Sequence, residues 1–142
     1  MDEERMRRLV AEAQVARMAT VDAEGRPHVV PIVFAVDGDT VYSSVDEKPK
    51  ASRDLKRIRN LRRNPVAELV VDHYEDDWER IWWVRLRGRA DVVEEGAERE
   101  RALDLLGRKY PQYRDAAPQG AVIAIRVDRW RGWSFRPVES PP

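Results

Sequence analysis

The sequence predicts a mainly β domain of the α+β class, in which six antiparallel strands form a barrel and helices pack at its edges. Three observations support this prediction. Several runs of residues alternate between apolar and polar side chains, short turns separate most of these runs, and only three segments show helical spacing. The 142 residues make one ordinary domain, residues 1–142, without room for separate cofactor and substrate domains.

The first half of the chain is predicted to be one helix followed by three strands. Apolar residues recur at helical spacing over residues 3–14. Residues 15–21 and 27–36 are extended runs on either side of a glycine-containing turn, which is typical of a hairpin. A second turn contains Gly38, and glycine accepts the positive φ that a tight hairpin turn needs. Residues 40–45 are then expected to be the third strand.

A loop and a helix are predicted in the middle of the chain. Residues 46–50 contain a proline and show no periodicity, so we expect a loop there. Ser52 precedes apolar residues at helical spacing, and a serine hydroxyl caps a helix by accepting a hydrogen bond from an amide of the first turn. Asn64-Pro65 is expected to end this helix, and residues 66–74 to form the fourth strand.

The clearest strand of the sequence covers residues 81–93. Apolar side chains occupy one face and charged side chains the other, as in a half-buried antiparallel strand. The apolar face carries Val84, Leu86, Ala90 and Val92, and the charged face carries Arg85, Arg87, Arg89 and Asp91. A helix over 96–110, a connecting loop over 111–120 and a last strand over 121–135 complete the prediction.

Composition excludes several classes of protein. The chain has no cysteine, which rules out disulfides, thiolate metal sites and a cysteine nucleophile. The charged start, MDEERMRR, is not a secretory signal, and no stretch approaches the ~18 apolar residues of a membrane span. Basic and acidic side chains number 26 each, whereas nucleic-acid binders usually carry a basic excess. We therefore expect a cytoplasmic protein that binds neither membrane nor nucleic acid.

Lysine is rare in this sequence and three of the four lysines lie close together. Lysine occurs only at Lys48, Lys50, Lys56 and Lys109. The first two precede the helix that Ser52 is predicted to cap. Free amides and a partial positive charge at a helix N-terminus favour anions, phosphate above all. The sequence therefore indicates a phosphate site at this loop, with a solvated basic loop as the alternative.

The sequence indicates structural roles for the histidines and for the clustered tryptophans. His28 and His73 have no serine or cysteine nucleophile motif beside them, so they make no catalytic triad, and their spacing matches no metal-ligand pattern; we predict no metal. Trp78, Trp82 and Trp83 are expected at a barrel wall or dimer interface, where they could also face a planar ring. The sequence contains no GxGxxG, P-loop or GxSxG motif.

Taken in order, short segments resemble the pyridoxamine-phosphate-oxidase-like split β-barrels. The match runs from about residue 10 to about residue 135. The segments are RMATVD with GRPHVVP for the first hairpin, TVYSSV for the third strand, KASRDL for the phosphate lysine and helix start, and RNLRRNP for the helix end. The combination of DEKPK with DHY and DW is similar to an actinobacterial subgroup of coenzyme F420-dependent oxidoreductases.

This resemblance implies a fold, a cofactor and a set of binding residues. The fold would be a six-stranded split β-barrel of the FMN-binding type that pairs as a homodimer, with two cofactors in grooves at the interface. The phosphate of the deazaflavin would meet Lys50, with Lys48 and Ser52 nearby. The ring would be bordered by Val30, Pro31, Ile32, Ser43 and Ser44, and Trp78 or Trp82 of the second chain would close the groove.

One departure from the family pattern leaves a second choice for the phosphate residue. The helix start is longer here than in many relatives, because Lys56-Arg57-Ile58-Arg59 lies between Leu55 and Asn60. Alignment on the following Asn-Leu pair would give the role to Arg57. We favour Lys50, because it lies in the loop before Ser52.

The resemblance implies hydride transfer from the reduced deazaflavin to a small organic acceptor. A cofactor performs this chemistry while the protein supplies placement and electrostatics, so we nominate no catalytic residue. Two alternatives remain open, an FMN enzyme of the same fold and a non-catalytic flavin-binding or deazaflavin-binding protein. Lys50→Ala should weaken cofactor binding, and Lys109→Ala is expected to have no effect and to serve as its control.

Overall fold

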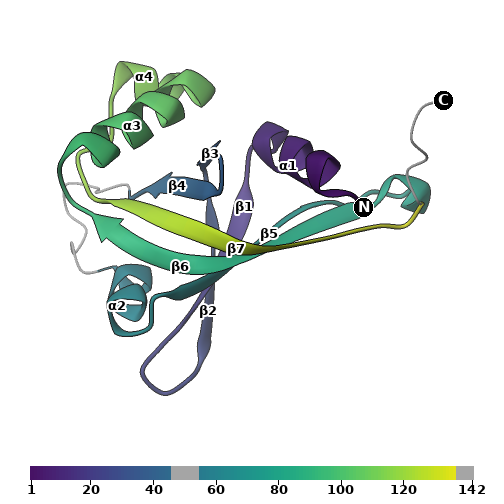
Figure 1. The fold of residues 1–142 in the computed structure, drawn as a ribbon, viewed down its shortest axis with the longest axis horizontal. Coiled ribbons are helices and arrows are strands. Elements are labelled where there is room, and N and C mark those ends of the chain that lie inside the picture. Colours follow the sequence, from purple (N-terminus) through teal and green to yellow (C-terminus); the bar gives the residue numbers. More distant parts are fainter. Residues whose placement is uncertain (46–54, 137–142) are drawn as a thin grey trace.

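The computed structural model describes residues 1–45 and 55–136. One antiparallel sheet dominates it, in the order β2-β1-β5-β6-β7-β4-β3 (Figure 1). The strands are β1 (Ala16–Val21), β2 (Pro27–Ile32), β3 (Ala35–Asp37), β4 (Thr40–Ser44), β5 (Val66–His73), β6 (Trp82–Val93) and β7 (Val122–Ser134). The helices are α1 (Glu3–Glu12), α2 (Lys56–Arg63), α3 (Ala97–Lys109) and α4 (Pro111–Asp115), with a short 3₁₀ turn η1 (Trp78–Arg80).

The sheet has seven strands, whereas the sequence predicted six. The run over 27–36 was predicted to be one strand, but it breaks at Val33-Phe34 into β2 and β3. β2 pairs with β1 at one end of the sheet, and β3 pairs with β4 at the other. Within the described residues no pairing joins β2 to β3, so the sheet is not closed by hydrogen bonds. The α+β class and the antiparallel pairing are confirmed.

The Tyr110 hydroxyl occupies the point where the chain crosses between the two ends of the sheet. It accepts a hydrogen bond from the Phe34 amide at 3.0 Å and lies 2.9 Å from the carbonyl oxygens of Phe34 and Gln14. Phe34 itself is almost fully buried. The hydroxyl therefore supplies partners for the Phe34 backbone groups, which the strand break removes from the sheet ladder and which need partners because they are buried.

The long antiparallel pair of β6 and β7 is the central feature of the sheet, and the alternation predicted for β6 is confirmed. Val84, Leu86 and Ala90 are buried, and the charged face is exposed. The register slips by one residue between Arg87 and Gly88, which marks a β-bulge. A Cβ atom on Gly88 would lie 2.1 Å from the Arg126 carbonyl oxygen, so this close approach requires glycine.

The turn at Gly38 and the apolar face of helix α1 agree with the sequence analysis. Gly38 has a φ of 60° in the two-residue turn between β3 and β4, as the turn sequence predicted. The Asp2 carboxylate caps α1 by accepting a hydrogen bond from the Arg5 amide at 2.8 Å. Met6 and Val10 are the buried residues of α1, on the face that the helical spacing indicated.

Two helix predictions need correction. Residues 111–120 were expected to be a loop, but Pro111 starts the short helix α4, where proline at the first position is well tolerated. The helix predicted to begin at Ser52 begins at Lys56, with Leu55 as an N-cap residue that makes no side-chain hydrogen bond. Ser52 is therefore not the cap of this helix, and it lies outside the described residues.

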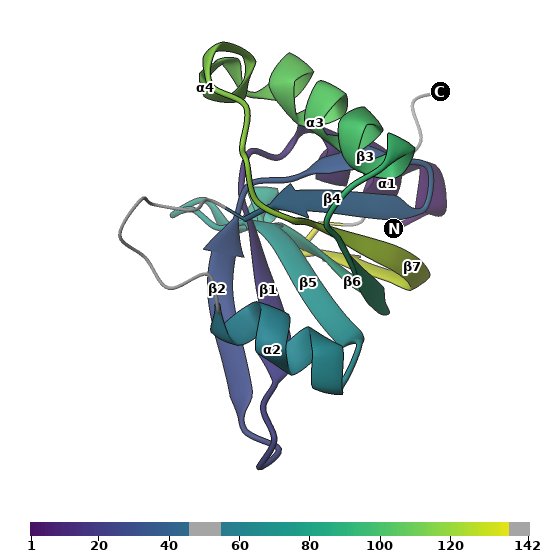
Figure 2. The same cartoon turned by 90° about the vertical axis from the view of Figure 1, so that its left-hand side faces the viewer.

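The main core lies between the sheet, α1 and α2, while α3 packs on β3 and β4 (Figure 2). Its fully buried side chains include Met18, Phe34, Leu86, Ile123 and Ile125. Glu98 ties α3 to the sheet, because its carboxylate accepts hydrogen bonds from the Tyr42 hydroxyl at 2.8 Å and from the Arg126 guanidinium. In the described part of the chain, no helix is long and apolar enough to span a bilayer.

Candidate functional site

A cleft runs between helix α2 and the turn that joins β1 to β2. A buried polar contact holds these two elements together, because the Asn60 side-chain amide donates to the Thr20 hydroxyl at 3.0 Å. Both residues are at least nine-tenths buried. The neighbouring Ile58 and Leu61 anchor the other side of α2 in the main core. Helix α2 is therefore fixed to the first hairpin by both polar and apolar contacts.

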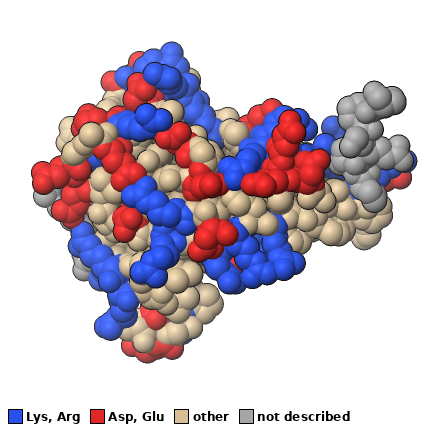
Figure 3. All heavy atoms as spheres, in the orientation of Figure 1, with Lys and Arg blue, Asp and Glu red and all other residues tan. Residues whose placement is uncertain are grey.

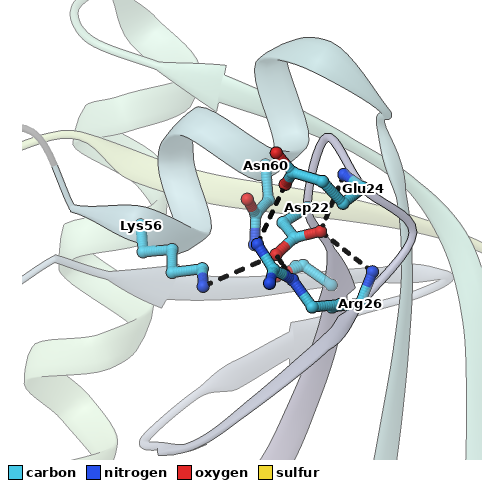
Figure 4. Close-up of polar contacts among 6 residues, drawn as sticks. Asp22, Glu24, Arg26, Lys56 and Asn60 are labelled. Carbon is cyan, nitrogen blue, oxygen red and sulfur yellow. Dashed lines mark hydrogen bonds and ion pairs between the residues drawn. The ribbon is translucent and has the colours of Figure 1, made fainter.

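Asp22 organises the turn at one side of the cleft (Figure 4). Its carboxylate accepts hydrogen bonds from the backbone amides of Glu24 and Arg26, both at 2.9 Å, and from the Arg26 guanidinium at 3.1 Å. The bond from the Arg26 amide is the largest cause that lowers the pKa of Asp22 to about 2. Asp22 is therefore ionised near neutral pH and also attracts Lys56, whose Nζ lies 3.7 Å away.

Basic side chains dominate the cleft, which has a volume of about 620 Å³. Its lining residues are Asp22, Ala23, Glu24, Arg26, Lys56, Arg59, Asn60, Arg62 and Arg63. Five of these are basic and two acidic, so the lining carries a formal charge of +3. Some of this charge is already paired, since Arg62 lies 2.6 Å from Glu94. The cleft can attract an anion, but among its lining residues there is no nucleophile paired with a base.

Of the three clustered lysines, the structure describes only Lys56. Lys48, Lys50 and Ser52 lie outside the described residues, so their predicted role at a phosphate group stays a prediction. Arg57, the second choice, lies partly buried in the first turn of α2 and is not among the residues that line the cleft. Lys56 of the same turn does line it.

Three of the five residues predicted to border the deazaflavin ring lie where β2 ends beside β4. Ile32, Ser43 and Ser44 are all buried. The Ser43 hydroxyl donates to the Val33 carbonyl at 2.9 Å, which joins the end of β2 to β4. Ser44 Oγ is buried and has no hydrogen-bond partner among the residues that the structure describes. A buried hydroxyl without a partner is unfavourable, so Ser44 can take a ligand atom as its partner.

The other two residues predicted to border the ring, Val30 and Pro31, differ in their exposure to solvent. Val30 packs against the edge of the main core. Pro31 is exposed on the opposite face of β2, because side chains alternate along a strand. The five residues predicted to border the ring therefore do not form one continuous wall within a single chain.

Trp78 lies far from α2 in the same chain. The 3₁₀ turn that carries it follows β5 at the end of the molecule opposite α2 (Figure 1). Its side chain is 64% exposed and touches Phe135 edge-to-face, with ring centroids 6.4 Å apart. A second chain would have to bring Trp78 to the groove, as the resemblance implied.

Sequence analysis missed the residues that shape the cleft. Thr20 and Asn60 are 40 positions apart, and nothing local marks them as partners. Asp22 had a local signal, because an aspartate three residues before a glycine is typical of an Asx turn. That signal predicts the turn but not the contact with Lys56.

The two histidines show no arrangement that would hold a metal ion. His73 lies on the exposed end of β5 with its Nε2 against the Glu75 carboxylate. His28 Nδ1 is buried without a hydrogen-bond partner in the described part of the chain. Over residues 1–45 and 55–136, histidine and acidic side chains form no group of three that could bind a metal.

Comparison with protein families and solved structures places this fold among known ones. A family model described as pyridoxamine 5'-phosphate oxidase matches residues 2–134. No curated protein sequence matches the chain at a significant level.

Three solved structures illustrate the similarity in fold. A conserved hypothetical protein from Mycobacterium tuberculosis has a TM-score of 0.78 at 21% identity, and the match covers 100% of this chain and 92% of that one. HutZ, the heme storage protein from Vibrio cholerae, has a TM-score of 0.72 at 18% identity over 93% of each chain. An FAD-binding protein from Mesorhizobium loti has a TM-score of 0.71 at 18% identity, with 93% of this chain and 94% of that chain covered.

Proposed function

Because the chain belongs to the pyridoxamine 5'-phosphate oxidase family, we propose that it is a dimeric reductase that uses the deazaflavin coenzyme F420. The family accounts for the fold and for a flavin-like cofactor. The choice of the deazaflavin rests on the resemblance of DEKPK, DHY and DW to the F420-dependent subgroup.

The observation that carries the proposal is the buried Ser44 hydroxyl. It ends β4, and the segment with Lys48 and Lys50 follows directly in the sequence. Its oxygen has no hydrogen-bond partner in the described residues, whereas the neighbouring Ser43 hydroxyl is satisfied by Val33. A polar cofactor atom at this position would supply the missing partner, so the residues present fit a bound ligand.

The chain supplies binding and placement rather than acid–base chemistry. Bound in its reduced form, the deazaflavin supplies a hydride for a small organic acceptor such as a quinone, an enone or a tetrapyrrole. Lys50 and the basic residues near the start of α2 would hold the phosphate end. Ile32 would provide an apolar wall against the ring, and Ser44 would orient it. Trp78 of a second chain would exclude water from the groove.

FMN, FAD and heme are the competing ligands. The Mesorhizobium loti protein is FAD-binding and the Vibrio cholerae protein stores heme, and both share the fold of this chain. A flavin presents a tricyclic ring and a phosphate much like the deazaflavin, so the fold by itself does not choose between them. A protein that only binds or stores such a ligand would show no turnover.

A titration followed by a turnover assay tests the proposal. The purified protein is titrated with coenzyme F420, FMN, FAD and heme while its tryptophan fluorescence is followed. Binding of the deazaflavin in preference to the others, followed by oxidation of its reduced form by a member of the acceptor panel, is expected. Preference for FMN, FAD or heme would overturn the cofactor assignment. Tight deazaflavin binding with no turnover on any acceptor would identify a binding protein instead.

Lys50→Ala tests the phosphate contact within this proposal. Loss of a charge-assisted contact should weaken deazaflavin binding by on the order of 1–3 kcal/mol. Lys109 is unsuitable as the control, because its Nζ is buried and lies 3.9 Å from the Phe34 ring centroid. Arg108→Ala replaces it, since an exposed ion pair with Asp104 is the polar contact of Arg108 among the described residues. Equal losses in the two variants, or a loss only in Arg57→Ala, would contradict the role of Lys50.

A further inference from the structure

The face of the sheet turned away from α1 carries a cluster of arginines. On the opposite face, the Arg7 guanidinium of α1 lies 4.7 Å from the Trp130 ring centroid, so Trp130 of β7 points toward α1. Side chains alternate along a strand, which places Arg129 and Arg131 on the side away from α1. Figure 3 shows a group of basic side chains beneath the long strands on that side.

These arginines line one hollow of about 190 Å³. Its lining residues are Glu68 of β5, Arg85 and Arg87 of β6, and Arg129 and Arg131 of β7. Glu68 is the only carboxylate among them and accepts a hydrogen bond from Arg87 Nε at 2.9 Å. Within the described residues, Arg129 and Arg131 make no ion pair, and Arg85 contacts only the Trp83 ring, at 5.5 Å. The lining therefore carries a formal charge of +3.

The strand register makes this arrangement unfavourable without a ligand. Arg85 lies directly opposite Arg131, and Arg87 lies directly opposite Arg129. Like charges at directly opposite positions of an antiparallel pair destabilise the sheet. The hollow holds two such arginine pairs and a single carboxylate. A bound anion would stabilise this arrangement, because it would replace the repulsion between the guanidinium groups with attraction to a shared partner.

We propose that this hollow binds a small molecule with a di- or triphosphate group. Arginine presents a planar fork of N–H donors that matches phosphate oxygens in pairs, and its charge persists at all physiological pH values. Three uncompensated charges in one small hollow favour a multiply charged anion over a single carboxylate. The site lies on β5, β6 and β7 and includes none of the residues assigned to the cofactor groove, so it stands without the proposed function.

Isothermal titration of the full chain with inorganic diphosphate, at physiological salt, tests the site. One diphosphate per chain is expected to bind at this hollow. Arg129→Ala and Arg131→Ala should each weaken that binding about tenfold or more, as for the loss of a charge-assisted contact. Arg89→Ala is the matched control, because Arg89 is an exposed arginine on the same face of β6 and does not line the hollow. Lys50→Ala should retain the binding, which separates this site from a phosphate site in the cofactor groove.

Thermal melting gives a second test. The difference in melting temperature between Arg131→Ala and the unchanged protein should change sign when diphosphate is added. Without diphosphate, Arg131→Ala should melt at a higher temperature than the unchanged protein, because one repulsive pair is removed. With diphosphate the order should reverse, since the unchanged protein gains more from the ligand. Absence of binding at millimolar diphosphate, equal weakening by Arg89→Ala, or binding of citrate without diphosphate would each overturn the proposal.

Discussion

At the scale of single residues, the Tyr110 hydroxyl is expected to contribute more to stability than a typical surface tyrosine. It makes hydrogen bonds with backbone groups of Phe34 and Gln14, which are distant from Tyr110 in the sequence, in the buried region between β2 and β3. Tyr110→Phe leaves a buried amide and a carbonyl without a partner, so we expect the free energy of unfolding to fall by about 1–3 kcal/mol. Urea denaturation measures this, with Tyr74→Phe as the exposed control. A change below that of Tyr74→Phe would show that water replaces the hydroxyl.

Lys109 gives the protein a pH-dependent stability in the alkaline range. Burial lowers the pKa of its ammonium group to about 8. Between this value and the ordinary pKa of lysine, the unfolded chain binds more protons than the folded one, so the stability rises as the pH increases through that window. Below pH 8 the folded protein carries a buried charge whose only described contacts are the rings of Phe34 and Tyr110.

Lys109→Met should remove this burial cost while keeping the hydrocarbon chain. At pH 7 the variant is expected to be more stable by roughly 1–3 kcal/mol, since one pKa unit corresponds to about 1.4 kcal/mol. Its stability should also stay flat between about pH 8 and 10, in contrast to the unchanged protein. Urea denaturation at a series of pH values measures both effects. A less stable variant at pH 7 would mean that the attraction between the ammonium group and the Phe34 ring outweighs desolvation.

At the scale of elements, Glu98 couples α3 to the sheet. The hydrogen bond from the Arg126 guanidinium is the main cause that lowers the pKa of the Glu98 carboxyl to about 2, with help from the Tyr42 hydroxyl. A depressed carboxyl pKa stabilises the fold above the ordinary glutamate value near 4.5, and this stabilisation is lost as the pH falls toward 2. The attachment of helix α3 to the sheet should therefore weaken in acid.

Glu98→Gln is expected to lower the free energy of unfolding at pH 7 by about 1–2 kcal/mol, the range for a hydrogen bond to a charged group that is partly exposed. The variant should also lose less stability than the unchanged protein between pH 5 and 2. Thermal melting across this range measures the difference. Glu100→Gln is the control on the same helix, because the Glu100 side chain is largely exposed. Parallel acid profiles for Glu98→Gln and the unchanged protein would contradict the assigned pKa.

At the scale of the whole molecule, we propose that two chains together build each cofactor groove. Trp78 lies at the opposite end of the chain from α2 (Figure 1). Two deficient variants can therefore restore each other in a mixed dimer. Lys50→Ala and Trp78→Ala should each bind deazaflavin weakly, whereas a mixture unfolded and refolded together should regain some sites, because one groove of each mixed dimer has both residues intact.

Fluorescence titration of the refolded mixture measures this recovery, with each variant refolded alone as the control. Sedimentation velocity on the unchanged protein should show a dimer at the concentrations used. A monomer by sedimentation, or a mixture that binds no better than its components, would show that the groove is completed within one chain.

Features that depend on near neighbours could be predicted from local sequence. The alternation along β6, the apolar face of α1 and the turn at Gly38 follow from local periodicity and backbone preference, and the structure confirms them. The limits of most elements agree to within one or two residues, because side chains of one segment largely decide whether that segment can bury one face.

Features that join distant residues depend on tertiary contacts and could not be predicted from local sequence. The local pattern of residues 27–36 predicts one continuous strand. In the structure this run divides, because its first half pairs with β1 and its second half with β4. The Tyr110 hydroxyl binds the Phe34 amide at the break between the halves. The contact between Thr20 and Asn60 and the facing arginine pairs of β6 and β7 likewise depend on strand register and helix packing. Register is set by burial across the whole sheet, so no stretch of sequence read alone contains it.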